Sequence, residues 1–350
     1  MDDQVAFKLR LPIKGTIKRT IFSQFCGGES IQESIDTSTR LAEFGVDTIL
    51  DYSIEGKVSD EDFDATVDEI IATIQEGKRN ENIPFAVFKV TGIGRFDLLN
   101  KANPGIEHLN EVDRKTYNEL VNRVDLICKA AHEASQPLFI DAEESWIQDS
   151  IDRIATDMMR RYNKEKAIVF NTLQMYRHDR LEYFRKEIVA AKNESYFLGV
   201  KIVRGAYMEK ERDRAEEMGY PSPIQPDKAA TDRDFDLALD LAIHHIDMVS
   251  ICAGSHNEES SMLLTKLMKE HNIDKSNSSV YFAQLLGMSD HISFNLAYEG
   301  YKVAKYVPYG PVKEVMPYLI RRAEENTSVA GQTGRELSLI NKERKRRKSR

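Results

Sequence analysis

Short β-rich runs alternate with longer amphipathic stretches along most of this 350-residue chain, and the alternation limits the folds open to it. The runs rich in branched and aromatic residues are candidate strands at 48–53, 84–90, 137–140, 167–171, 196–203, 248–253, 279–282 and 301–307. Helical periodicity fills most of the intervals, over 60–74, 111–134, 147–159, 180–191, 231–243, 258–270 and 292–298. Because no repeated hairpin signal separates the strands, the pattern predicts a parallel sheet. Eight such units predict an α/β fold closed into a (β/α)8 barrel.

The length of the chain permits one large barrel or two ordinary domains. No convincing linker divides it, since the turn-rich segment 219–226 lies inside the unit that follows the fifth strand. We therefore expect one barrel domain over residues 41–330. It would be preceded by a helical prefix over residues 1–40, packed on the barrel, and followed by a basic tail over 331–350.

Composition is that of a folded protein, with 41% hydrophobic and 30% charged residues. No apolar run approaches the ~20 residues that cross a bilayer, and the opening Met-Asp-Asp-Gln lacks a signal-peptide pattern. The excess of 57 acids over 49 bases argues against wholesale nucleic-acid binding. The three cysteines lack a Cys-x-x-Cys pair, so we expect reduced thiols and a cytoplasmic protein.

Near the C-terminal end, a predicted helix carries polar groups where a core helix would be apolar. Pro311 after Gly310 suits a first helical position. Helical spacing then gathers Tyr318, Arg321, Arg322 and Glu325 on one face, with 315, 319 and 320 on a flank that can pack. Two adjacent guanidinium forks suit a carboxylate or a phosphate, although a solvated charged face explains the same pattern.

Several residues fall at or just beyond the predicted strand ends, where (β/α)8 barrels carry their chemistry. They are Lys89, Asp141, Gln174, Lys201, His256, Leu285 and Tyr306. Each has an ordinary alternative explanation, such as a helix cap for Asp141 or a satisfied core histidine for His256. No Gly-x-Gly-x-x-Gly opens a helix after the first strand and no Walker loop is present, so a Rossmann dinucleotide site has no support.

A set of ordered motifs resembles the proline dehydrogenase family. The segments VKIVRGAY (200–207), GSHN (254–257), FAQLLGM (282–288) and 306–326 follow that family's order. Upstream, LDYSIE (50–55), FKVT (88–91) and IDAEE (140–144) match its earlier strands, so the resemblance covers roughly residues 20–330. It implies a distorted barrel whose last helix lies over the mouth. No extension of aldehyde-dehydrogenase size follows residue 330, which indicates the monofunctional form.

The resemblance implies a noncovalent FAD held across the barrel mouth. The matched cofactor positions are Gln174, Lys201, Arg204, Gly205, Ala206, Tyr207, Thr231, His256 and Asn257. Gly205 permits close backbone approach, and cationic Lys201 and Arg204 can stabilise negative charge on reduced flavin and pyrophosphate. A plain basic strand edge is the alternative. The bifunctional branch of the family has an arginine at the position of Lys201, where lysine keeps a donor but loses the fork.

The resemblance also implies the substrate, L-proline, and residues that hold it. Arg321, Arg322 and Lys89 match the positions that pair with the carboxylate, and Leu285, Tyr306 and Tyr318 match those that pack on the ring. We expect Glu325 to pair with an arginine and hold its rotamer, and Asp141 to orient Lys89 or another residue that contacts the substrate. The bulky Tyr306 disfavours a substrate with a 4-hydroxyl group.

Expected chemistry is oxidation of L-proline to Δ1-pyrroline-5-carboxylate, with hydride transfer to flavin N5 and electrons passed to a quinone. A pyrroline-5-carboxylate dehydrogenase would act downstream. Quinone chemistry implies peripheral contact with the inner face of a respiratory membrane. The tail fits this, because seven of its last nine residues, 342–350, are positive, although a solvated terminal helix is the simpler reading.

Three alternatives stay open from sequence. One is a hydroxyproline dehydrogenase of the same family. A second is a flavin-free barrel lyase or isomerase that uses Lys89 or Lys201 for Schiff-base or proton chemistry. The third is a carboxylate-binding sensor that keeps the arginine pair but turns nothing over. Visible flavin absorption would separate the flavoenzymes, a proline or a hydroxyproline dehydrogenase, from the lyase or isomerase and from the sensor.

Overall fold

The structure is a computed structural model that describes residues 22–52, 59–328 and 332–348. Side chains of residues 321–337 and 339–340 lie outside the description. The strands are β1 (Asp47–Tyr52), β2 (Phe85–Lys89), β3 (Leu138–Asp141), β4 (Val169–Gln174), β5 (Leu198–Val203), β6 (Val249–Gly254), β7 (Val280–Leu285) and β8 (Val303–Tyr309). Each predicted strand is present, with its ends within three residues of the prediction.

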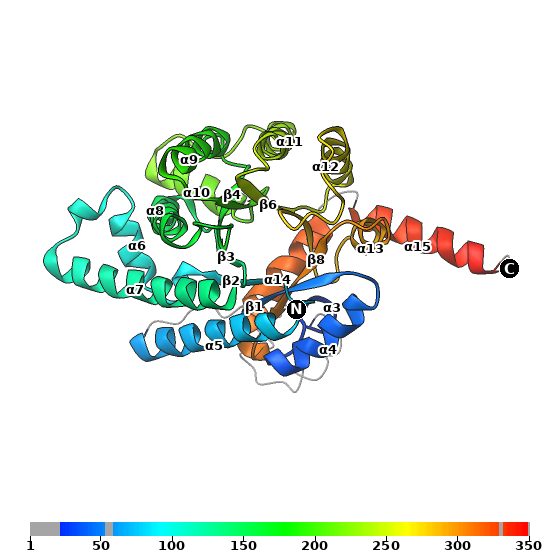
Figure 1. Ribbon diagram of the computed structural model, residues 1–350, viewed down its shortest axis with the longest axis horizontal. Coiled ribbons are helices and arrows are strands. Elements are labelled where there is room, and N and C mark those ends of the chain that lie inside the picture. The colour runs from blue at the N-terminus through cyan, green and yellow to red at the C-terminus, as the bar shows by residue number, and fades with distance from the viewer. Residues whose placement is uncertain (1–21, 53–58, 329–331, 349–350) are drawn as a thin grey trace.

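These strands close into a barrel in which each pairs in parallel with the next along the chain, and β8 pairs with β1 (Figure 1). At the closing seam Ile49 of β1 is in register with Tyr306 of β8. The predicted parallel (β/α)8 barrel is therefore confirmed. Since all eight strands run the same way, their carboxyl ends share one mouth.

Helices surround the strands, which suits the right-handed crossovers of parallel sheets. They are α3 (Ser23–Phe25), α4 (Ile31–Ala42), α5 (Asp60–Arg79), α6 (Phe96–Ala102), α7 (Glu111–Ala134), α8 (Ser145–Tyr162), α9 (Arg180–Glu194), α10 (Met208–Met218), α11 (Lys228–His244), α12 (Glu258–Glu270), α13 (Asp290–Tyr298), α14 (Val312–Ser328) and α15 (Gln332–Lys348), with 3-10 turns η2 (Val90–Gly92) and η3 (Ile106–His108). Helices α6 and α10 were not predicted.

Local side-chain chemistry explains several helix starts. The side chain of Asn110 accepts a hydrogen bond from Asp113 N at the start of α7, and Asn257 accepts one from Ser260 N at the start of α12. Such caps satisfy backbone N–H groups that have no partner inside the helix. The bounds of α7 and α12 coincide with the predicted ones.

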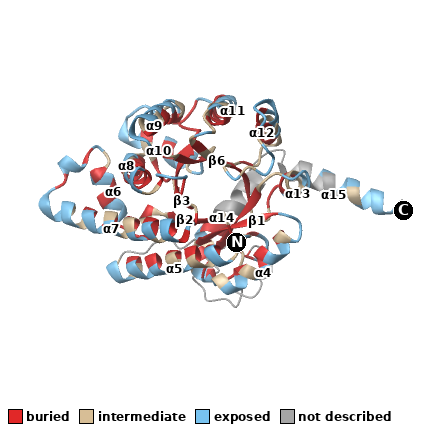
Figure 2. Ribbon diagram, in the orientation of Figure 1, coloured by how far each residue is buried: buried red, intermediate tan, exposed pale blue. Residues whose placement is uncertain are grey.

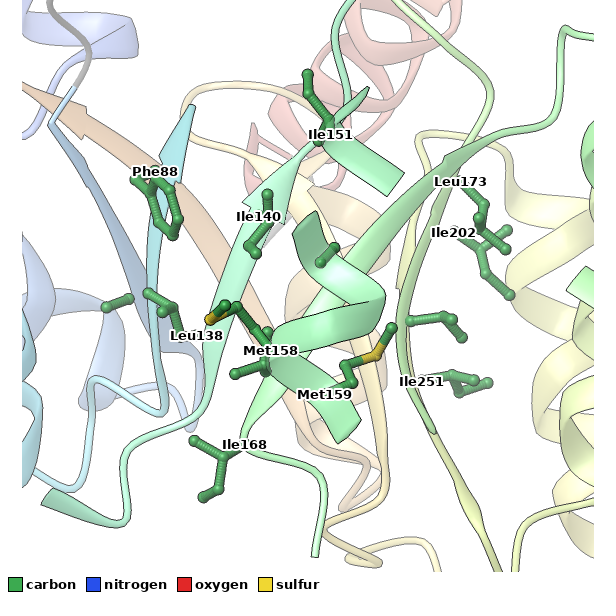
Figure 3. Packing of buried hydrophobic residues seen from close by; sticks show 14 of the residues in the cluster. Phe88, Leu138, Ile140, Ile151, Met158, Met159, Ile168, Leu173, Ile202 and Ile251 are labelled. Carbon is green, nitrogen blue, oxygen red and sulfur yellow. The ribbon is translucent and has the colours of Figure 1, made fainter. Parts of the chain in front are cut away.

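The main core lies between the outer face of the barrel and the inner faces of the helices (Figure 2). Figure 3 shows Met158 and Met159 of α8 among branched side chains of the strands, such as Ile140 and Leu173. Burial of this kind stabilises by roughly 25 cal/mol per Å² of apolar surface, and it fixes the strands that carry the mouth residues.

A second core fills the barrel interior towards the amino ends of the strands. The ring of Phe85 stacks on Phe139 with centroids 4.3 Å apart, and it meets the edges of Phe170 and Tyr281 at 5.6 and 4.9 Å. Gly199 makes room for this packing, because a Cβ there would lie 2.6 Å from the Val169 carbonyl oxygen and 2.7 Å from the Phe170 ring. We call the rings of Phe85, Phe139, Phe170 and Tyr281 the aromatic floor.

A third cluster joins α14 to the mouth. Val315, Tyr318 and Leu319 of α14 are buried against Met288, in the loop after β7, and against Phe22 and other residues of the N-terminal segment. The expectation that 315 and 319 lie on a packed flank is confirmed. The first half of α14 therefore lies beside the carboxyl ends of the strands.

Candidate active site

At the barrel mouth, one carboxylate joins three strands. Asp141, the last residue of β3, forms an ion pair with Lys201 of β5 and accepts a 2.7 Å hydrogen bond from the Tyr306 hydroxyl of β8. The Lys201 and Asp141 side chains are only 7% and 14% exposed. The structure thus brings together three of the predicted site residues around one buried charge pair.

Aromatic faces surround the lysine of this pair. Its Nζ lies 4.9 Å from the ring centroid of Tyr306 and 5.1 Å from that of Phe139 in the aromatic floor. A cation over a ring face is attracted by the ring quadrupole, so these rings also hold the ammonium in place. Burial, and next the Asp141 charge, raise the pKa of Tyr306 well above its usual range. The phenol is therefore a hydrogen-bond donor here and not a base at neutral pH.

Lys89 ends β2 and is in register with Asp141 of β3, which places both at the same rim of the barrel. The charge of Lys89 acts on Glu143, a residue that sequence reasoning did not select. Glu143 accepts hydrogen bonds from Thr91 N at 3.1 Å and from the Thr91 hydroxyl. Burial raises the pKa of Glu143 to about 7, while the Thr91 hydrogen bonds and the charge of Lys89 act in the opposite direction. Its place in the run 140–144 after a strand is the signal that could have found it.

Gln174 ends β4 and is buried, and its Nε2 donates a 2.7 Å hydrogen bond to the Glu143 carbonyl oxygen. This bond ties the rim of β4 to the loop after β3. The amide is therefore fixed at the mouth.

Arg204 follows β5 and is held by one partner from its own unit and two from the next unit. Its Nε donates to Asp232 at 2.6 Å, and its two terminal nitrogens donate to the hydroxyls of Ser255 at 2.6 Å and Ser260 at 2.9 Å. The guanidinium also lies 4.3 Å from the ring centroid of Phe235. Of these partners only Ser255 lay in a motif that the sequence analysis singled out. No sequence pattern indicated that Asp232 would contact Arg204.

The backbone at Gly205 has an unusual conformation, with φ of +130°. A side chain there is excluded, because a Cβ would lie 2.5 Å from the Tyr176 ring. Gly205 and Ala206 are exposed, and Tyr207 is half-buried directly before α10. This short stretch is therefore a bare backbone surface beside Arg204, suited to close approach of a ligand.

The remaining cofactor positions lie on the neighbouring units, and two of them also have local structural roles. His256 Nδ1 is 3.0 Å from the Ser289 hydroxyl oxygen. Asn257 caps α12, and the Thr231 hydroxyl donates to the Asp227 carbonyl oxygen at 3.3 Å within α11. The backbone and ring of 256–257 still lie at the carboxyl end of β6, where the predictions placed them.

The predicted ring-packing residues come together from β7, β8 and α14. Leu285 is in register with Tyr306, and it packs against the cluster that contains Tyr318. Arg321, Arg322 and Glu325 belong to the second half of α14, and their side chains lie outside the described residues. The carboxylate clamp stays a prediction.

Comparisons with known proteins bear on this geometry. The family model described as proline dehydrogenase matches residues 34–335. Proline dehydrogenase 1, mitochondrial, of Dictyostelium discoideum is 34% identical, over 97% of this chain and 67% of that protein. Hydroxyproline dehydrogenase of Xenopus laevis is 30% identical, over 95% of this chain and 78% of that protein. The chain spans only 37–41% of several other curated relatives.

Among solved structures, proline utilization A from Bdellovibrio bacteriovorus, inactivated by N-propargylglycine, matches with a TM-score of 0.81. The match has 20% identity and covers 94% of this chain and 36% of that chain, so it shows likeness of fold. The family match and the Dictyostelium relative show that the chain belongs to the proline dehydrogenase family.

Proposed function

We propose that this protein oxidises L-proline to Δ1-pyrroline-5-carboxylate with a noncovalent FAD at the barrel mouth. The observation that carries the proposal is the buried cluster of Lys201, Asp141 and Tyr306, next to Leu285, at the carboxyl end of a barrel of this family. A barrel built only to bind a carboxylate has no need of a buried charge pair between its strands, because desolvation makes such a pair costly.

The donors around the mouth fit the chemistry of a flavin dinucleotide. Such a cofactor has a planar ring and an anionic pyrophosphate. A guanidinium has five N–H groups, and at Arg204 three are engaged with Asp232, Ser255 and Ser260. The exposed backbone at Gly205 and Ala206 follows this cation directly in the chain, and Gln174 ends β4 at the same mouth. Lys201, Tyr207, Thr231, His256 and Asn257 complete the set that we propose to hold the cofactor. When bound, the flavin supplies a hydride acceptor.

The protein's own residues would bind and orient the substrate. In this proposal Lys89, Arg321 and Arg322 pair with the carboxylate, and Leu285, Tyr306 and Tyr318 wall the ring. Asp141 keeps Lys201 and Tyr306 in place, and Glu325 supports the arginines. Since the raised pKa of Tyr306 keeps its phenol protonated, we assign it to positioning and assign proton removal from the amine to solvent. Alignment and charge stabilisation are then the main catalytic contributions.

The electron acceptor and the cellular setting belong to the same proposal. We propose a quinone as acceptor, a pyrroline-5-carboxylate dehydrogenase as the next enzyme, and a peripheral contact with the inner face of a respiratory membrane. The exposed basic residues near the end of α15, which are Lys342, Arg344, Lys345, Arg346, Arg347 and Lys348, support such a contact with anionic lipid. In the described ranges, no helix combines the length and the apolar character needed to cross a bilayer. The boundaries at 40 and 330 remain part of this proposal.

Hydroxyproline is the competing substrate, because one relative is named a hydroxyproline dehydrogenase. Tyr306 favours proline. It is 8% exposed, and its hydroxyl already donates to Asp141. A 4-hydroxyl beside it would be desolvated without a ready partner, which typically costs about 1 to 3 kcal/mol.

The test is anaerobic reduction of the FAD-loaded protein, followed by visible absorbance. We expect L-proline to bleach the flavin, and trans-4-hydroxy-L-proline to do so with a lower kcat/KM. Arg322→Met should weaken proline binding by about 2 to 5 kcal/mol and leave flavin content unchanged. Arg346→Met, on the exposed part of α15, is the matched control and should bind proline normally. A flavin that stays oxidised in excess proline would end the proposal.

A further inference from the structure

One lysine of β8 is buried without belonging to the cluster at the mouth. Lys305 precedes Tyr306, and because side chains alternate along a strand it faces the opposite side of the sheet, towards α13. Its side chain is 0% exposed. Burying an ammonium is costly unless acceptors surround it, so its surroundings are informative.

The acceptors come from one short loop. Lys305 Nζ donates to the carbonyl oxygens of Leu285, at 3.3 Å, and of Met288, and it pairs with Asp290 Oδ1 at 2.8 Å. These three residues span the connection from β7 to the first residue of α13. We call residues 286–289, with their two flanking anchors, the β7–α13 loop. An ammonium has three N–H donors, so one lysine is able to hold this loop at three points.

Two residues of the loop have positive φ angles, so the contacts on either side of them bear on its shape. Gly287 has φ of +74°, and a Cβ there would collide with the Gln24 backbone carbonyl. Ser289 also has a positive φ, of +51°, which is unfavourable for a residue with a side chain. The backbone strain at Ser289 persists only when its surroundings determine it, and the Lys305 contacts at Met288 and Asp290 lie on both sides of that residue.

Three parts of the mouth depend on the same loop. Leu285 is a proposed wall of the substrate site. The Ser289 hydroxyl lies 3.0 Å from His256 Nδ1, one of the proposed cofactor positions. Met288 is buried in the cluster that seats Tyr318 and Val315 of α14. A shift of the loop would therefore move a substrate wall, a cofactor contact and the seat of α14 together.

We propose that Lys305 is a positioning residue, whose buried ammonium fixes the β7–α13 loop and thereby places Leu285, His256 and α14 for catalysis. The kinetic part of this inference rests on the proposed function. Lys305 touches neither substrate nor cofactor in this account, and it acts through the loop. A purely structural role would instead make it a stabiliser of β8 and α13, with no effect on the folded enzyme's kinetics.

The test compares Lys305→Met with Lys302→Met in the full-length, FAD-loaded protein. Both variants replace a lysine by an uncharged chain of similar length, but Lys302 lies before the amino end of β8, away from the mouth. For Lys305→Met we expect faster amide exchange over 285–290 and a rise in KM for proline on the order of ten-fold to a hundred-fold. We expect kcat to change less than KM. Lys302→Met should leave both readouts near the wild-type values.

Asp290→Ala keeps the test decisive if Lys305→Met fails to fold. The Asp290 side chain is 60% exposed, so its substitution removes one of the three anchors at little risk to the core. We expect the same changes as for Lys305→Met, but smaller. If the loop exchanges at the wild-type rate, or exchanges faster with KM and kcat unchanged, the positioning role is wrong. Failure of the proposed function itself is seen earlier, as a wild-type flavin that proline does not reduce, and loop exchange then still decides whether Lys305 fixes the loop.

Discussion

The two ends of the barrel interior use the same residue types for different purposes. Each end has an aspartate whose carboxylate accepts from a tyrosine hydroxyl. At the mouth, Tyr306 donates to Asp141 at 2.7 Å, and Lys201 supplies a cation in contact with the same carboxylate. At the floor, Tyr281 donates to Asp47 at 3.5 Å beside the stacked rings.

Charge balance is what separates the two ends. Burial raises the pKa of Asp47 to about 6, and the charge of Lys302 and the Tyr281 hydrogen bond only partly oppose it. The mouth carboxylate has a directly bonded cation, and the floor carboxylate has none as close among the described residues. The floor therefore consists of packed aromatic rings beside one carboxylate, Asp47, that has no bonded cation among the described residues. The mouth instead holds a buried charge pair. Because a buried charge pair is costly to maintain, we expect the mouth to be the end that performs chemistry.

Removing the mouth carboxylate should have the largest effect. Asp141→Asn leaves the buried Lys201 ammonium without its counter-ion, and breaking a buried pair from one side typically costs about 3 to 5 kcal/mol. We expect that loss in the free energy of unfolding, measured with urea, together with loss of proline oxidation. Asp64→Asn is the matched control. Asp64 pairs with Arg123 at the surface with its own side chain 67% exposed, so its loss should cost less than about 1 kcal/mol.

Equal stability losses in the two variants would break the comparison, because they would mean that the pair at the mouth is no more demanding than a surface ion pair. A large stability loss with full activity would separate the two parts of the claim. The pair would then support the fold, and the assignment of the mouth residues to catalysis would be wrong.

The sequence predicted the parts of this molecule that depend on local patterns. β-rich runs between helical periods are local, and so are caps such as Asn110, which explains why all eight strands and the bounds of α7 and α12 were found. Helix α10 was missed because it is strongly charged and buries only Glu211 and Ala215, so it lacks a clear apolar period.

Ion pairs and hydrogen bonds across the barrel could not be predicted from the sequence, for a physical reason. Asp141 meets Lys201 across 60 residues of chain and Tyr306 across 165, and only barrel closure brings them together. Placement at strand ends predicted that these residues share the mouth, but not which cation pairs with which carboxylate. Lys305 shows the same limit. A single lysine inside a β run gives no sign that it is fully buried or that one loop supplies its acceptors.

Adding one methyl group to each end should have the next largest effect. Gly199→Ala puts a Cβ 2.6 Å from the Val169 backbone oxygen, which cannot move without shifting β4, and 2.7 Å from the Phe170 ring of the floor. Gly254→Ala, at the carboxyl end of β6, meets Val203 Cγ1 at 2.9 Å, and that side chain can adjust. We expect Gly199→Ala to cost about 1 to 3 kcal/mol and Gly254→Ala less. Thermal and urea unfolding measure both.

The reverse order would show that the mouth is packed as tightly as the floor. In that case the interior would be one continuous core, and the division into a packed end and a chemical end would rest on charge alone. Proline kinetics of both variants, measured well below the unfolding temperature, add a second check. Gly199→Ala should leave KM close to the wild-type value, since the floor does not touch the substrate.

The smallest expected effect concerns the floor acid, and it appears as a dependence on pH. An ordinary aspartate ionises near 3.8, and in the folded protein the pKa of Asp47 is about 6. Between these values the unfolded chain releases the proton and the folded protein keeps it, so the contribution of Asp47 to the free energy of unfolding should fall as pH rises from about 4 to 6 and then level off. Asp47→Asn should remove this fall, by about 1 kcal/mol given that the group is partly exposed. Urea unfolding of both proteins at pH 4, 5, 6 and 7, with Asp64→Asn as the surface control, measures the slope. An unchanged slope in Asp47→Asn would mean that the floor acid is solvated as well as a surface carboxylate. Water would then reach the floor, and burial of Asp47 could not be what distinguishes the floor from the mouth.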